Sequence, residues 1–281
     1  MLSLLLAWLR NLFVVSVVAI VSLSVYATQI EPNWFQVVRV KVDIPQLASN
    51  FDGFKIVQIS DLHADYAMTA QKFAKIVRLV DRQKPDIVAI TGDFFSYQPS
   101  QKSAELLETS LIKLLPKEKT VAVLGNHDHY YDPQILRQIL QKSNILELEN
   151  SVYNIQRGEE VLSIAGVDDY WKQKARLDLV LQELPKKSIA VIMAHEPDFA
   201  DLSAATKRFV LQMSGHSHGG QVKLPFLPPP VLPTFAKKYP LGRYQVGNMV
   251  QYTNRGIGMG KPLVRLGARP EITVFTLSAS S

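Results

Sequence analysis

The pattern of apolar and polar positions changes sharply along the chain. Residues 1–27 are apolar apart from Arg10, Asn11 and a few serines, and no charge follows residue 10 within this stretch. A run of this length predicts a membrane-spanning helix, here a single-pass N-terminal anchor. A cleaved signal peptide is the alternative, because residues 25–27 have the small-residue spacing of a cleavage site. The charge in the middle of the segment favours the anchor, and positive charges on both flanks leave the side of the membrane open.

Beyond the anchor, residues 28–53 contain two prolines, a glycine and the alternating piece "VVRVKVDI", which predicts a tether with one strand. From residue 54, short apolar runs alternate with segments whose apolar residues recur at helical spacing. We expect strands at 54–60, 86–92, 120–125, 151–156, 161–167, 188–195 and 209–215, and helices at 69–83, 103–115 and 133–143. The last 60 residues predict short strands broken by glycine and proline.

This order of elements predicts an α/β fold with buried central strands, and the strand-rich second half indicates a second sheet. Apolar residues make up 47% of the chain, which is typical of a globular protein. No linker interrupts residues 54–278, so we expect one domain there.

Polar side chains follow five of the apolar runs, at the point where each run ends. The motifs are Asp61-Leu62-His63, Gly92-Asp93, Gly125-Asn126-His127-Asp128, His195, and Gly215-His216-Ser217-His218-Gly219-Gly220. In α/β sheets this edge is where ligands bind. Any one of these histidines alone would be read as a structural residue, but five of the six in the chain fall in these motifs. The set therefore predicts one site.

The donor atoms indicate which metals would bind. The chain has no cysteine, and carboxylate, amide and imidazole donors suit divalent ions such as Mn, Fe or Zn. There are too many ligands for one ion, but two ions fit if one carboxylate bridges them, and Asp93 is placed to do so. Paired metals about 3.5–4 Å apart stabilise the attacking and leaving oxygens of a phosphoryl displacement.

The motifs "D-x-H", "GD", "GNHD", "AHEP" and "GHSHGGQ", in this order, resemble the calcineurin-like metallophosphoesterase superfamily over residues 54–278. The stretches "GHSHGGQVKLP" and "TNRGIGMG…RPEITVFTL" are similar to its membrane-linked bacterial branch, the YkuE/YaeI-like phosphodiesterases, whose relatives include UDP-2,3-diacylglucosamine pyrophosphatases. The resemblance implies a sandwich of two mixed β-sheets flanked by helices.

The resemblance also implies a role for each site residue. Its pattern assigns the first metal to Asp61, His63, Asp93 and His218, and the second to Asp93, Asn126, His195 and His216. His127 would contact the phosphate and donate a proton to the leaving oxygen, and Asp128 would orient the imidazole. The alternative for Asp128 is a helix N-cap.

The positive charge is concentrated near the C-terminus. Residues 221–281 carry eight Lys or Arg and one Glu, which gives this segment a net charge of +7. The net charge of the whole chain is +6, so the remaining residues sum to −1. Arg243, Arg255 and Arg265 are candidates for binding a second phosphate, with surface ion pairs as the alternative. The segment "LPFLPPPVLPTFAKKYP" (224–240) is either a lip that meets a bilayer or an acyl chain, or a proline-stiffened loop packed on the domain.

These observations predict a dinuclear metal-dependent phosphoesterase that cleaves a phosphodiester or diphosphate bond. A lipid-linked substrate such as UDP-2,3-diacylglucosamine fits the anchor and the apolar segment. One alternative is a membrane-anchored sensor that binds a phospho-ligand without turnover; the His127–Asp128 pair favours the enzyme. The other is a nuclease, but the anchor and the lack of a nucleic-acid module argue against nucleic acid as a partner. The sequence predicts no oligomeric state.

Overall fold

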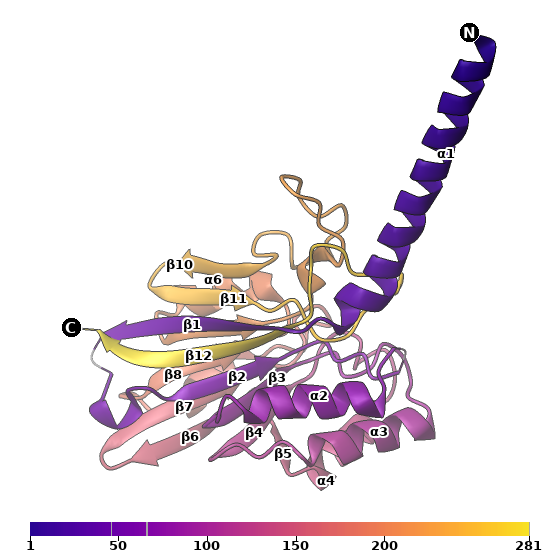
Figure 1. The fold of residues 1–281 in the computed structure, drawn as a ribbon. Coiled ribbons are helices and arrows are strands. Elements are labelled where there is room, and N and C mark those ends of the chain that lie inside the picture. The colour runs from indigo at the N-terminus through magenta and orange to yellow at the C-terminus, as the bar shows by residue number, and fades with distance from the viewer. Residues whose placement is uncertain (46, 66, 281) are drawn as a thin grey trace.

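The computed structural model describes residues 1–45, 47–65 and 67–280. Two six-stranded β-sheets pack face to face, helices cover their outer faces, and one long helix projects away from the domain (Figure 1). The predicted sandwich of two mixed sheets flanked by helices is therefore confirmed.

The first sheet has the strand order β1-β12-β2-β3-β4-β5. Strands β2 to β5 run parallel, β12 is antiparallel to β2, and β1 is parallel to β12. Its strands are β1 (Gln36–Pro45), β2 (Lys55–Ile59), β3 (Ile87–Thr91), β4 (Lys119–Val123), β5 (Ile145–Glu147) and β12 (Glu271–Ser280).

The second sheet has the order β10-β11-β9-β8-β7-β6, with a parallel centre and antiparallel pairs at both edges. Its strands are β6 (Ser151–Arg157), β7 (Glu160–Gly166), β8 (Ile189–Met193), β9 (Phe209–Ser214), β10 (Gly242–Val246) and β11 (Met249–Thr253). Apolar residues from the facing sides of the two sheets form the central core.

The helices pack their apolar stripes on the outer faces. Helices α2, α3 and α4 cover the first sheet, and α5 and α6 cover the second. Thr69 and Ser100 cap the N-termini of α2 and α3 by accepting hydrogen bonds from backbone N–H groups. The bounds are α2 (Ala70–Asp81), α3 (Gln101–Leu111), α4 (Gln134–Lys142), α5 (Leu177–Glu183) and α6 (Ala200–Ala205).

Strand β12 is longer than the sequence pattern predicts, and it pairs with the strand predicted in the tether. The strand predicted within residues 28–53 is β1, and it forms an edge of the first sheet, paired with β12 from Gln36–Glu271 to Pro45–Ser280. The last 60 residues contain the short strands β10 and β11, as predicted, but β12 extends over ten residues. The reason lies in the sequence, because neither glycine nor proline follows Pro270.

The projecting helix α1 (Leu2–Val25) has no buried residue along its length. The helical stretch Leu2–Asn33 is long and apolar enough to cross a membrane, with a mean hydropathy of 2.3 in its most apolar window. Its base is fixed to the domain: the backbone N–H of Arg265 donates to the carbonyl of Ala27 at 2.9 Å, and that of Ala268 donates to the buried Glu31 carboxylate at 2.7 Å.

Candidate metal centre

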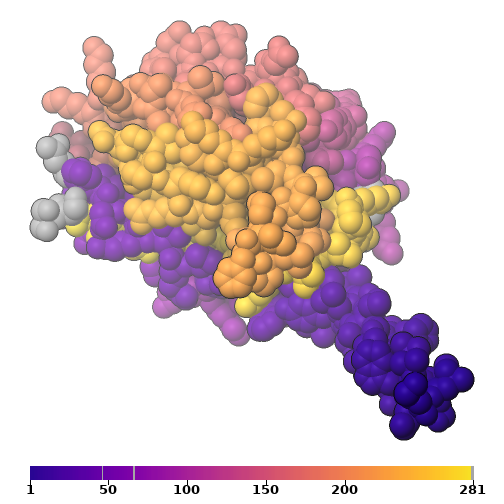
Figure 2. Space-filling view, turned by 90° about the horizontal axis from the view of Figure 1, so that it is seen from above, coloured from indigo at the N-terminus to yellow at the C-terminus, as the bar shows by residue number. Residues whose placement is uncertain are grey.

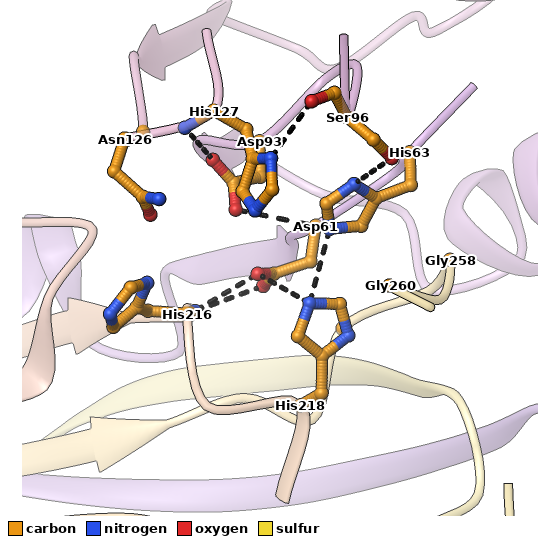
Figure 3. A network of polar contacts seen from close by, with 12 residues as sticks. Asp61, His63, Asp93, Ser96, Asn126, His127, His216, His218, Gly258 and Gly260 are labelled. Carbon is orange, nitrogen blue, oxygen red and sulfur yellow. Dashed lines mark hydrogen bonds and ion pairs between the residues drawn. The ribbon is translucent and has the colours of Figure 1, made fainter. Parts of the chain in front are cut away.

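The five sequence motifs meet at one edge of the sandwich, because the strands that carry them end there. Asp61 and His63 follow β2, Asp93 follows β3, and Asn126 and His127 follow β4; His195 follows β8, and His216 and His218 follow β9. The structure thus brings together side chains that lie up to 157 positions apart, several of which Figure 3 shows converging.

Four of these side chains form a first group. One potential ligand atom from each of Asp61, His63, Asp93 and His218 lies within 4.8 Å of the others. His218 Nε2 is 3.3 Å from Asp61 Oδ1 and 3.1 Å from His63 Nε2. The group combines two carboxylates with two imidazoles, a donor set suited to a divalent cation.

A second group shares Asp93 with the first and adds His195 and His216. His195 Nε2 lies 3.2 Å from Asp93 Oδ2 and 3.2 Å from His216 Nδ1. Asn126 lines the same cavity, and its Oδ1 is buried with no hydrogen-bond partner among the described residues. A buried amide oxygen without a partner is costly, and coordination by a cation would remove that cost.

Hydrogen bonds behind two imidazoles fix which nitrogen faces the site. His195 Nδ1 donates to the carbonyl of Thr91 at 2.7 Å, and His216 Nε2 donates to the carbonyl of Thr234 at 2.9 Å. The remaining ring nitrogens, His195 Nε2 and His216 Nδ1, therefore face each other with their lone pairs. A positive charge between them stabilises this arrangement. Although burial disfavours the charged ring, the Asp93 carboxylate raises the pKa of His195 well above its usual value.

Burial holds three further imidazoles of the two groups neutral. Burial lowers the pKa of His63 to about 4 and that of His216 to about 3, and it lowers the pKa of His218 well below its usual value. Neutral rings offer lone pairs, the form that binds metals without first releasing a proton.

The backbone around the site is strained. Five side chains of the two groups stand on residues with positive φ: Asp61 (51°), His63 (42°), Asp93 (55°), His216 (71°) and His218 (52°). Each such residue costs about 1–3 kcal/mol and persists only where its surroundings enforce it. Close packing does so here, since a Cβ at Gly215 would overlap Ser60 Oγ and Asp61 Oδ2. Concentrated strain of this kind is typical of functional sites.

His127 lines the cavity beside these groups, and its contacts differ from the expectation. Its ring Nδ1 donates to the carbonyl of Ser96 at 2.9 Å, and its backbone N–H donates to Asp93 Oδ1 at 3.0 Å. With Nδ1 engaged, Nε2 is the ring atom available to a ligand.

Asp128 does not orient this imidazole, and it does not cap a helix. Its carboxylate accepts hydrogen bonds from four backbone N–H groups, those of Asp93, Phe94, Phe95 and Gly125. Burial and then the Asp93 charge raise the pKa of Asp128 to about 7, against these donors, which stabilise the carboxylate. Asp128 therefore fixes the loops that present Asp93 and Asn126.

Several residues of the site lie outside the motifs. Ser96 Oγ contacts His63 Nδ1 at 2.8 Å and donates to Asp65 at 3.1 Å, so one serine supports both His63 and His127. The rings of Trp171 and His216 pack in a T-shaped arrangement, with centroids 5.5 Å apart. In the sequence, the contact between Ser96 and His63 is indicated only by the position of a serine three residues after Asp93. No sequence pattern indicates the contact between Trp171 and His216.

The three arginines considered for phosphate binding lie elsewhere. Arg265 is fully buried and donates to the carbonyls of Arg255, Gly256, Gly258 and Ala268. Arg255 pairs with Glu271, and the exposed Arg243 donates to a carbonyl of β1. None of the three lines the cavity over the metal centre. The expectation was wrong for Arg265 because a guanidinium can be satisfied by carbonyl oxygens as well as by anions.

A cavity of about 500 Å³ opens over the metal centre. His63, Asp93, Asn126, His127 and the two histidines after β9 form its polar floor. Its walls are largely apolar and come from distant segments: Tyr130, Trp171, Val222, Pro230, Val231, Pro233, Pro262 and Val264.

Carboxylate, amide and imidazole donors gathered at the ends of a two-sheet sandwich are what a calcineurin-like phosphoesterase requires. The model of that family matches residues 54–220, more than half of the chain, and the chain belongs to this family. It is a metal-dependent hydrolase of phosphoric ester or anhydride bonds.

Similarity to individual relatives indicates a branch within this family. The chain is 31% identical over 258 residues to the uncharacterized metallophosphoesterase YkuE of Bacillus subtilis, covering 91% of this chain and 90% of the relative. It is 27% identical over 256 residues to phosphodiesterase YaeI of Escherichia coli, covering 90% and 92%. It is 25% identical over 308 residues to UDP-2,3-diacylglucosamine pyrophosphatase LpxG of Chlamydia trachomatis, covering 89% and 92%. The predicted resemblance to the YkuE/YaeI-like branch is confirmed.

Proposed function

We propose that the chain hydrolyses a phosphodiester or diphosphate bond in a lipid-linked substrate with the help of two divalent cations. The carrying observation is the cavity, whose polar floor lies at the two groups of metal-binding side chains and whose walls are apolar. The names of two relatives, a phosphodiesterase and a diacylglucosamine pyrophosphatase, support both the reaction and the substrate class.

We assign one cation to Asp61, His63, Asp93 and His218, and the other to Asp93, Asn126, His195 and His216. The shared carboxylate of Asp93 and the unpartnered oxygen of Asn126 support this division. Bound cations of this kind supply Lewis-acid stabilisation of the phosphoryl oxygens and lower the pKa of a bound water.

His127 handles the leaving group in this proposal. The carbonyl of Ser96 holds its Nδ1, so Nε2 points to the ligand and can carry the proton that the departing oxygen takes up. The Asp93 carboxylate receives the His127 backbone N–H, which fixes the distance between this acid and the metal centre. A sensor without turnover would have no use for such a proton donor.

The apolar walls are the basis for a lipid-linked substrate. Val222, Val231 and Val264 stand beside the floor, where a hydrocarbon chain attached to the phosphate would exclude water from them. The proposed anchor, α1, would keep the enzyme at the membrane that holds such a substrate. Relatives named as transmembrane proteins with a metallophosphoesterase domain support the anchor.

The test begins with metal-depleted full-length protein, reloaded with Mn, Zn or Fe in detergent. We expect elemental analysis to give two ions per chain, and hydrolysis of diesters or diphosphates to exceed that of monoesters. Lipid-linked substrates should be preferred over soluble ones with the same phosphate linkage. One ion per chain at full activity, or no preference for the lipid, would contradict the corresponding part of the proposal.

A further inference from the structure

One segment beside the cavity is apolar and exposed, which is unusual for a loop. The proline loop, residues 224–233, presents Leu224, Phe226, Leu227 and Val231 to solvent, and the side chains of Phe226 and Val231 are 104% and 73% exposed. Prolines fix φ at five of its ten positions, which limits the conformations available to the loop. Clustered exposed apolar side chains mark a surface that contacts a partner or a membrane.

We propose that the tip of the proline loop is a second membrane contact, which inserts into the leaflet surface from which α1 emerges. The proposal rests on the proposed anchor and goes beyond it, because it fixes the orientation of the catalytic domain. The mouth of the cavity then faces the lipid.

Hydrogen bonds connect the loop to the base of α1. Ala27 accepts from the backbone of Arg265, and Leu266, the next residue, accepts from Lys223 at 2.7 Å. Lys223 immediately precedes the proline loop. Figure 1 shows the loop rising from the domain on the same side as α1, and Figure 2 shows loop, connecting segment and helix base as neighbours. Loop and helix thus approach one plane together.

The residues around this plane suit a lipid headgroup layer. Trp34, at the base of α1, is half exposed, and the guanidinium of Arg269 lies 3.9 Å from the centroid of its ring. Lys223 immediately precedes the proline loop and Lys261 lines the cavity beside it, and both carry positive charge. Aromatic and basic side chains around an apolar tip are the composition found at membrane interfaces.

The same loop is anchored to the metal centre. The carbonyl of Thr234, which follows the loop, accepts the hydrogen bond from His216, and Pro229 packs so closely on Gly220 that a Cβ there would overlap it. Val231 belongs both to the exposed tip and to the cavity wall. The tip is therefore held at a set distance from the chemistry, and a lipid tail would pass from the bilayer along Val231 to the floor.

A fluorescence experiment tests the contact without relying on catalysis. The chain has no cysteine, so Phe226→Cys creates a single labelling site for an environment-sensitive dye in the full-length protein. Glu159→Cys, in the exposed turn between β6 and β7, is the matched control. Both variants are reconstituted into vesicles of phosphatidylcholine and phosphatidylglycerol. At position 226 we expect the emission of the dye to shift to the blue, to be quenched by nitroxide-labelled lipid and to be protected from iodide. At position 159 we expect no blue shift, no quenching by the lipid and full quenching by iodide. Iodide quenching at both positions would overturn the proposal.

A second experiment joins the contact to turnover. Phe226→Asp with Leu227→Asp alters residues that do not line the cavity. We expect hydrolysis of a vesicle-borne substrate to fall by about tenfold or more, because apolar burial in the bilayer is lost, with a soluble diester hydrolysed as before. Phe226→Trp should retain both activities. An equal effect on both substrates, or on neither, contradicts the proposal. If no diester is hydrolysed at all but the dye reports lipid, the proposed function fails and the membrane contact stands.

Discussion

The floor and the walls of the cavity are built by opposite means. In and directly beneath the floor, the metal-facing side chains are buried except for the partly buried His218, and five of them stand on strained backbone. The walls consist of apolar side chains from loops far apart in the sequence, and Val231 is largely exposed.

This difference indicates that the floor determines catalysis and the walls determine the choice of substrate. Hydrogen bonds such as those of His195, beneath the floor, and His216, in it, keep catalytic groups within fractions of an ångström, as catalysis requires. Walls that rely on non-directional apolar contact can change between relatives without disturbing the floor. Substitutions on the floor should therefore alter turnover with every substrate, and substitutions in the walls only the choice among substrates.

The largest effect is expected from the residue shared by both metal groups. Asp93→Asn removes the bridging charge, so we expect both cations to be lost and kcat/KM to fall by about a thousandfold or more with soluble and lipid-linked substrates alike. Elemental analysis and steady-state kinetics check this outcome, with Asp178→Asn, in an exposed ion pair, as the control. Full activity with two bound ions would show that the floor does not depend on a bridge.

His127→Ala should separate proton donation from metal binding. We expect kcat to fall by about 10²–10⁴ while the metal content stays at the native level. The loss should be smallest for substrates whose leaving group needs no proton, such as nitrophenyl esters. A uniform loss across leaving groups would show that His127 acts by binding the phosphate alone.

The buried Arg265 donates hydrogen bonds to the segment behind Asp61 and to the base of α1. Replacing this side chain should therefore lower the free energy of unfolding. Arg265→Met leaves several buried carbonyls without a donor, and we expect the free energy of unfolding to fall by about 2–4 kcal/mol. The exposed Arg243→Met is the matched control and should change it by about 0.5 kcal/mol or less. Denaturant unfolding in detergent measures both, and equal values would contradict the structural role.

A smaller effect is expected for Ser96→Ala. This change removes the hydroxyl behind His63 but keeps the carbonyl behind His127, so we expect metal affinity to fall by about tenfold and the leaving-group dependence to stay as it is. Metal titration of the depleted protein measures the affinity. A changed leaving-group dependence would place the hydroxyl in the proton transfer instead.

The smallest effect is expected in the walls. Val264→Ser should raise KM for a lipid-linked substrate by about fivefold, since roughly 1 kcal/mol of apolar contact is lost, and leave a soluble diester unchanged. Paired kinetics with the two substrates check this. A loss shared by both would place Val264 with the floor.

Much of the fold and most of the floor could be predicted from the sequence. Short apolar runs and helical spacing located most strands and helices, and polar motifs at strand ends located the seven side chains that converge. The rest depends on tertiary contacts that leave no local pattern. Trp171 contacts His216 only because two loops meet. Asp128 accepts hydrogen bonds from backbone amides instead of orienting the adjacent imidazole. Arg265 donates to carbonyl groups whose proximity the sequence does not indicate.

The pairing of β1 with β12 has a consequence for biosynthesis. Gln36 of β1 pairs with Glu271 of β12, 235 positions later in the chain. This edge of the first sheet therefore cannot form until residues 271–280 have been synthesised, long after β1. We expect the nascent chain to carry an open sheet edge until then, which makes the addition of β12 the step that commits the polypeptide to its native state.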